Sequence, residues 1–240
     1  MPKRWLAGRN DVSLQSHPSG AVDGPSAGEY APQFRRHCHE LIAFGYVAIH
    51  GESHSESEED FITQRLREAI QTGQNDGVLP DWADRYFVYD QMPVDVPGLR
   101  GKGRPKIDIR FESTESRRRP VYHFEAKRLR ASDTHSVSEY VGGNGLGMFL
   151  VELYGRMGDE GGMLGYVQSE SPTHWADRIG GKLHPDAPDN HQLTANGAWA
   201  RVPLVDEFEH TYATRHARPN LGNITIYHTL LDFRGNTPTE

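Results

Sequence analysis

The chain has 240 residues, a net charge of −7 and a single cysteine, Cys38. This length supports one substantial domain, one cysteine excludes an internal disulfide, and the negative charge argues against a protein that binds phosphates through overall positive charge. No apolar run is long enough to cross a bilayer and the start, MPKRWLAGRND, lacks an apolar signal core, so we expect a cytoplasmic protein without membrane contact.

The N-terminal part divides into a polar arm and a helix. Residues 1–30 are rich in Gly, Ser and Pro and predict a flexible arm, whereas residues 31–240 predict a single domain. A helix is expected from about Pro32 to Ile49. It contains the run His37-Cys38-His39, which resembles zinc ligands, but adjacent helical residues point apart and no further ligand pair follows. We therefore favour a packed helix there.

A second helix is predicted from Ser57 to Gln71, with Ser57 as its N-cap and three acidic residues in its first turn. Glu59 is aligned with an apolar stripe three, four, seven and eleven residues further on, so its side chain should face the sheet. Glu58 is the next candidate, and a role limited to the helix dipole would explain both acids. A strand is expected around Tyr86 to Tyr89.

Two segments, Lys106–Phe111 and Val121–Lys127, alternate apolar and polar residues and predict an antiparallel hairpin with its turn near Ser116 and Arg117. The register that follows is given by the pairs Phe111 with Tyr122, Ile109 with Phe124 and Ile107 with Ala126, which would form an apolar face. The opposite face would pair Asp108 with Glu125, Lys106 with Lys127 and Arg110 with His123.

Asp108 and Glu125 would then stand directly opposite each other, with Cβ atoms roughly 5 Å apart. Two carboxylates at that distance repel each other unless a cation lies between them. Carboxylate oxygens and a backbone carbonyl, here that of Ala126, are the ligands that Mg²⁺ prefers. The hairpin therefore predicts a Mg²⁺ site, in which Mn²⁺ should substitute.

Basic residues are concentrated around this hairpin. Eleven of the 26 Lys and Arg residues fall between positions 100 and 130, whereas acids gather elsewhere, notably from Glu52 to Glu59. A basic zone around an acidic metal site is what a phosphodiester substrate requires. The predicted substrate contacts are Lys106, Arg110, Arg128 and Arg130. The three arginines at 117–119 are explained equally well as a solvated turn.

The remaining elements complete an α+β pattern. A helix from about Ser136 is interrupted by GGNGLG and resumes as MFLVELYGRM. The glycine run lacks the Lys-Ser/Thr ending of a phosphate loop, so it indicates a turn or a close backbone approach. A buried strand (Gly162–Ser169), a helix that starts with Pro172 and stops at Gly180, and two antiparallel edge strands within FEHTYATRHAR and ITIYHTLLDF follow. We expect a mixed central sheet flanked by helices.

The hairpin resembles the motif of the PD-(D/E)XK nuclease superfamily, in which an Asp closes one strand and an acid-x-Lys element closes the next. Here these are Asp108 and Glu125-Ala126-Lys127; Ile107 stands where the family often has Pro, and Pro105 lies three residues before Asp108. The resemblance implies a restriction-endonuclease-like core of α/β/α type over about residues 57–170, with a C-terminal β extension.

The resemblance also implies an activity, a Mg²⁺-dependent deoxyribonuclease. Asp108, Glu125, the Ala126 carbonyl and Glu59 would hold one or two Mg²⁺ ions, and Lys127 would orient or help deprotonate the attacking water. Two neighbouring carboxylates should raise the pKa of Lys127 in the metal-free protein, which argues against a simple neutral-lysine base.

The implied partner is DNA, duplex in preference to single-stranded, with a homodimer or a partner subunit supplying a second site. Many stand-alone proteins of this kind act in restriction of foreign DNA or in phage defence. Two alternatives stay open: a catalytically inactive nuclease-fold module that binds DNA or regulates, and an unrelated binding protein whose acidic face is merely solvated.

Overall fold

The computed structural model describes residues 27–52, 54–95, 100, 103–115, 119–133, 135–155, 158–187 and 191–235. The strands are β1 (Tyr86–Pro93), β2 (Lys106–Ser113), β3 (Val121–Leu129), β4 (Glu160–Val167), β5 (Ala200–Arg201), β6 (Thr211–Arg218) and β7 (Gly222–Asp232). In the described part of the chain they form one seven-stranded sheet in the order β1-β2-β3-β4-β7-β6-β5. β4 is parallel to both of its neighbours, β3 and β7, and the other pairs are antiparallel.

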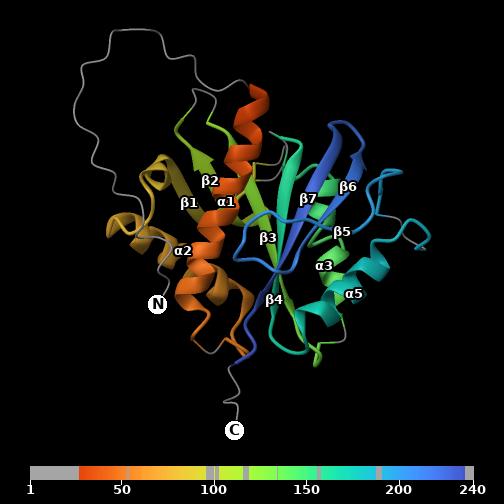
Figure 1. Cartoon of the computed structure of the whole chain (residues 1–240). Coiled ribbons are helices and arrows are strands. Elements are labelled where there is room, and N and C mark those ends of the chain that lie inside the picture. The colour runs from red at the N-terminus through yellow and green to blue at the C-terminus, as the bar shows by residue number, and fades with distance from the viewer. Residues whose placement is uncertain are drawn as a thin grey trace.

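Helices cover both faces of this sheet (Figure 1). They are α1 (Ala27–Ile49), α2 (Glu59–Asn75), the 3-10 helix η1 (Asp81–Arg85), α3 (Ser136–Val141), α4 (Gly147–Leu150) and α5 (Pro172–Lys182). The expected α+β architecture, a mixed sheet flanked by helices, is thereby confirmed. None of the described helices is both long and apolar enough to traverse a lipid bilayer.

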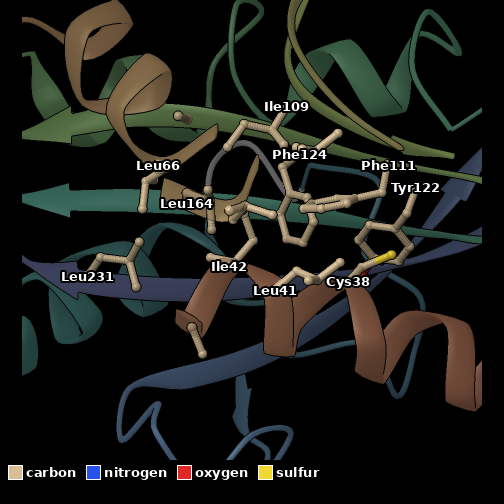
Figure 2. Packing of buried hydrophobic residues seen from close by; sticks show 14 of the residues in the cluster. Cys38, Leu41, Ile42, Leu66, Ile109, Phe111, Tyr122, Phe124, Leu164 and Leu231 are labelled. Carbon is tan, nitrogen blue, oxygen red and sulfur yellow. The ribbon is translucent and has the colours of Figure 1, made fainter. Parts of the chain in front are cut away.

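Two buried apolar clusters lie on opposite faces of the sheet, as the alternation along β4 requires. Leu164 and Tyr166 belong to the cluster under α1 and α2, whereas Met163 and Val167 belong to the cluster under α3, α4 and α5. Figure 2 shows the first cluster, in which Ile42 of α1 and Leu66 of α2 lie near the strand residues.

Helix α1 carries the His37-Cys38-His39 run, and the predicted packed helix is confirmed. Cys38 is fully buried, and the flanking histidines pair with tyrosines of the sheet: His37 Nδ1 lies 2.7 Å from the Tyr86 hydroxyl and His39 Nε2 lies 3.2 Å from the Tyr122 hydroxyl. The helix begins at Ala27, five residues before the predicted start at Pro32, and most of the predicted arm, residues 1–26, lies outside the described residues.

The predicted N-cap of α2 was wrong by one residue. Glu58, not Ser57, is the N-cap. Ser57 is held outside the helix because its hydroxyl lies 3.3 Å from His54 Nδ1 and its carbonyl accepts a hydrogen bond of 2.7 Å from the Gln168 amide. The helix also continues past Gln71 to Asn75.

The predicted hairpin register is confirmed from Phe111–Tyr122 to Ile109–Phe124, including Arg110 opposite His123. The turn around Ser116 and Arg117 lies outside the described residues. The register does not continue, however: the β2–β3 pairing ends at Ile109, short of the expected pairs of Asp108 with Glu125 and Lys106 with Lys127.

The predicted apolar pair of Ile107 with Ala126 was wrong for the same reason. Ile107 packs in the cluster under α3 to α5, whereas Ala126 packs under α1 and α2. The Asp108 carboxylate takes the Ala126 N–H, a donor that the β2 backbone would otherwise use, and β2 separates from β3 at this point. The pairing of β1 with β2 is also interrupted here, at Gln91, whose φ is +49°.

The later elements were predicted with three errors. The helix expected in MFLVELYGRM ends at Leu150, because Glu152 has a φ of +63°, which a helix cannot continue through. Helix α5 runs to Lys182 rather than stopping at Gly180. The strands β6 and β7 pair antiparallel as predicted, but β7 is not an edge strand, since it also pairs with β4.

Candidate active site

Four side chains from three elements meet where β2 separates from β3. Glu59 comes from the first turn of α2, Asp108 from β2, and Glu125 and Lys127 from β3. The Lys127 ammonium is at their centre: Nζ donates to Glu125 Oε1 at 2.8 Å, to Glu59 Oε1 at 3.0 Å and to the Ala126 carbonyl at 2.6 Å. These are the residues that the sequence singled out.

Asp108 is only 6% exposed and is fixed from both sides. Its Oδ2 accepts the Ala126 N–H at 2.7 Å, and its Oδ1 accepts a hydrogen bond of 3.0 Å from the Gln91 amide. Gln91 also reaches Asp60 Oδ1 at 3.2 Å. Sequence reasoning missed Gln91, and the available signal was its place on the strand before the hairpin, where an antiparallel neighbour would face Asp108.

The structure brings Glu59, rather than Glu58, to Lys127. The second carboxylate oxygen of Glu59 accepts the Arg128 N–H at 3.0 Å, so the α2 terminus is joined to β3. The Glu58 side chain is 75% exposed and pairs with the Arg128 guanidinium at 2.9 Å. The alignment of Glu59 with the apolar stripe of α2 explains this difference, because Ile62, Thr63, Leu66 and Ile70 are all buried.

Burial controls the charge state of the site. It lowers the pKa of Lys127, but the negative charges of Glu125, Glu59 and Asp108 outweigh burial and raise that pKa above its ordinary value, as predicted. Burial, helped by the charge of Asp108 and opposed by that of Lys127, raises the pKa of Glu125 to about 9. Burial also raises the pKa of Glu59 and of Asp108. The three carboxyl groups together therefore favour a nearby cation.

One oxygen of this cluster stands apart. Among the described residues, no donor makes a well-formed hydrogen bond to the buried Glu125 Oε2. The Tyr154 hydroxyl lies close to Glu125, whose charge adds to burial in raising the Tyr154 pKa, but that hydroxyl donates its proton to the Lys106 carbonyl. A buried carboxylate oxygen without a donor is costly unless a cation or a proton reaches it.

Two hollows open on either side of Lys127. The first, the acidic hollow, has a volume of about 530 Å³ and is lined by Glu58, Glu59, Asp60, Lys127, Arg128, Asp133, Glu139 and Asn144. The second, the mixed hollow, has a volume of about 550 Å³ and is lined by Gly103, Arg104, Pro105, Lys106, Glu125, Lys127, Asn144, Met148, Leu153 and Tyr154. Lys127 and Asn144 line both.

Asn144 was not predicted as a site residue. It belongs to the GGNGLG run, which forms the predicted close backbone approach: a Cβ at Gly145 would lie 2.3 Å from the Tyr140 carbonyl oxygen. The Leu146 N–H donates to that same carbonyl at 2.9 Å. The glycines thus fold the chain tightly after α3 and leave Asn144 exposed between the two hollows.

The predicted substrate contacts separate into two groups. Lys106 lines the mixed hollow and Arg128 the acidic hollow, whereas Arg110 and Arg130 are not among the described residues that line either hollow. Arg110 pairs with Glu112 at 3.1 Å and Arg130 with Glu56 at 2.6 Å. Although the acids of residues 52–59 are separate from the basic zone in sequence, Glu58 and Glu56 pair with Arg128 and Arg130, because the start of α2 lies beside the end of β3.

The residues at the site suit a hard divalent ion. Carboxylate oxygens, a backbone carbonyl and the buried Glu125 Oε2 are the donor set that Mg²⁺ prefers. In the described ranges, no three acidic, histidine or cysteine side chains are already arranged around one point as a metal centre. Lys127 Nζ instead bridges Glu59 and Glu125. Comparison of the chain with models of known protein families, with curated proteins and with solved structures finds no match.

Proposed function

We propose that this chain is a Mg²⁺-dependent nuclease that hydrolyses phosphodiester bonds of DNA. The observation that carries the proposal is the contact of Lys127 Nζ with Glu59 and Glu125, next to an Asp108 whose carboxylate is fixed on the neighbouring Ala126 N–H. A lysine and three acids, gathered from segments nearly 70 positions apart, are costly to bury together unless they have a shared role.

The order of elements also supports the proposal. Helix α2 is followed by the antiparallel strands β1, β2 and β3, then by α3 and by β4, which is parallel to β3. This is the arrangement that the resemblance to the PD-(D/E)XK superfamily implies for residues 57–170. In it Glu59 lies in the first turn of α2, Asp108 near the start of β2, and Glu125 and Lys127 from the middle of β3 onward.

Asp108, Glu125, Glu59 and the Ala126 carbonyl would hold the ion. Bound there, Mg²⁺ would polarise the scissile phosphate and lower the pKa of a water molecule. In the metal-free protein the pKa of Lys127 is raised and a bound cation would oppose that shift. As an ammonium, Lys127 would donate hydrogen bonds to phosphate oxygens and offset the charge that develops on them. Gln91 keeps the Asp108 carboxylate oriented through Oδ1.

A cleavage assay tests the proposal. Supercoiled plasmid, linear duplex and single-stranded DNA are incubated with wild type, Lys127→Ala and Asp108→Asn, each with Mg²⁺, Mn²⁺ or EDTA. Glu56→Gln is the matched control, because within the described residues that acid pairs with Arg130 alone and lines neither hollow. We expect metal-dependent cleavage by wild type and Glu56→Gln alone. Equal cleavage by Asp108→Asn would refute the assignment.

The second candidate function is a nuclease-fold module that binds DNA or regulates without cleaving. The direct pairing of Lys127 with both Glu59 and Glu125 favours it, because Lys127 occupies both carboxylates without a metal ion. Binding of DNA without cleavage, together with no change in thermal stability on adding Mg²⁺ or Mn²⁺, would support this alternative. For an active enzyme, restriction of foreign DNA or phage defence is the biological role we propose, on the resemblance alone.

A further inference from the structure

The mixed hollow differs from the acidic hollow in charge. Two basic side chains besides Lys127, those of Arg104 and Lys106, line the mixed hollow, and Glu125 is its one acid among the described lining residues. Arg104 pairs with Asp95 at 2.6 Å, so the attraction for an anion rests mainly on Lys106. The acidic hollow has five acids against Lys127 and Arg128. A polyanion approaching Lys127 is therefore attracted on the mixed side and repelled on the other unless cations intervene.

The mixed hollow also has apolar walls. Met148 and Leu153 line it, and both are partly buried side chains packed against the core cluster under α3 to α5. Apolar side chains gain nothing from a phosphate group, which retains its water. They gain from the flat face of a base, and nucleic-acid enzymes use apolar side chains in this way to hold a base that has left its stack.

The loop that carries Leu153 is held rigidly. Glu152 has the strained φ of +63°, and its carboxylate accepts hydrogen bonds from the backbone N–H groups of Asn220 and Leu221, at 2.5 and 2.9 Å. Next to Leu153, the Tyr154 hydroxyl donates to the Lys106 carbonyl. The apolar wall and the basic side of the hollow are thus joined before any ligand arrives. The strained backbone at Glu152 persists because the surrounding hydrogen bonds enforce it.

We propose that the mixed hollow binds an unpaired nucleotide of a DNA strand next to the phosphate at Lys127, so that the site takes single-stranded or locally unpaired DNA. This inference rests on the proposed function. The hollow has a volume within the range of small-ligand pockets, about 300–1,000 Å³. In a paired duplex the base faces are stacked on one another and cannot reach Met148 or Leu153. Base and phosphate would then contact Leu153 and Lys106 together.

Binding is measured by fluorescence anisotropy in EDTA, where no cleavage occurs, with a labelled single-stranded oligodeoxynucleotide and with its blunt duplex. We expect wild type to bind the single strand about tenfold more tightly, and Leu153→Asp to lose about tenfold in single-strand affinity, the scale of one base contact. Val151→Asp is the matched control: Val151 is two residues away, is 60% exposed and lines neither hollow.

Lys106→Ala keeps the test valid if Leu153→Asp unfolds, because Lys106 is exposed. It should reduce the salt dependence of single-strand binding by about one ion. Equal affinity for the two DNA forms, no binding of either, or equal effects of the Leu153 and Val151 variants would overturn the inference. Selective single-strand binding without cleavage in Mg²⁺ or Mn²⁺ would refute the nuclease alone, whereas cleavage without this selectivity would refute the hollow alone.

Discussion

Replacing Lys127 by Met should convert a self-neutralised site into one that depends on a divalent cation for its stability. The Lys127 side chain is 12% exposed and that of Glu125 is 6% exposed, so their ion pair is largely shielded from water. Methionine keeps much of the volume of lysine but provides no charge and no hydrogen-bond donor. The carboxyl groups of Glu125, Glu59 and Asp108 would then lose the positive charge that opposes the rise in their pKa.

The expected cost follows from this burial. Removing one partner of a buried ion pair costs about 3–5 kcal/mol, which corresponds to about 6–20 °C in Tm for a domain of this size. The cost depends on pH. In wild type the folded-state pKa of Glu125 is already about 9, against the ordinary value of 4.5 in the unfolded chain, so both proteins lose stability in parallel as pH rises between these two values. Without Lys127 the pKa of Glu125 should rise further, so the variant continues to lose stability above about pH 9, where the loss caused by Glu125 in wild type ends.

Thermal unfolding of wild type and Lys127→Met is compared in EDTA at pH 8 and pH 10, and at pH 8 also with Mg²⁺. Lys106→Met is the control, because it removes an exposed lysine from the same hollow. We expect a larger loss at the higher pH and a larger stabilisation by Mg²⁺ in the Lys127 variant than in wild type, about 2.7 kcal/mol at a hundredfold excess over Kd. A Tm equal to that of wild type at pH 8, unchanged by Mg²⁺, would refute this account of Lys127.

Three further predictions concern the neighbouring parts of the fold. Glu59→Gln should lower metal-dependent cleavage of plasmid DNA by at least about tenfold. Glu58→Gln removes an exposed pairing with Arg128 and should lower cleavage less. The reverse order of the two effects would assign the role to Glu58. Burial lowers the pKa of His39 to about 3 and those of His123 and His216 to about 4. The free energy of unfolding, measured in urea, should therefore fall as pH drops below 6.5, by up to about 1.4 kcal/mol per pH unit for each histidine. A free energy of unfolding that is constant between pH 6.5 and 4.5 would contradict this. Gly145→Ala should lower Tm and displace Asn144, because the added Cβ would overlap the Tyr140 carbonyl oxygen. Gly143→Ala should leave Tm nearly unchanged, because a Cβ there meets no atom within 4 Å. Differential scanning calorimetry of both variants measures the two Tm values.

The sequence by itself determined features that depend on neighbouring residues. Alternation along two segments gave the pairs Ile109–Phe124 and Phe111–Tyr122, because each strand exposes successive side chains to opposite faces. The apolar stripe on α2 indicated that Glu59 turns toward the sheet. The start of α5 at Ser171-Pro172 depends on neighbouring residues alone, because the Ser171 hydroxyl accepts a hydrogen bond from the His174 N–H. The order of Asp108, Glu125 and Lys127 then sufficed to suggest a shared site.

Only the tertiary structure decided how segments distant in the chain meet. The Ala126 N–H donates to the Asp108 side chain instead of to a backbone carbonyl of β2, and Ile107 packs on the other face of the sheet. The alternation of residues within one strand does not predict such an interruption of the pairing. The contacts of Gln91 with Asp108 and of Glu56 with Arg130 join residues 17 and 74 positions apart. Periodicity specifies the face of an element, whereas the partner on that face is specified by packing, and so the two hollows beside Lys127 were visible only in the folded chain.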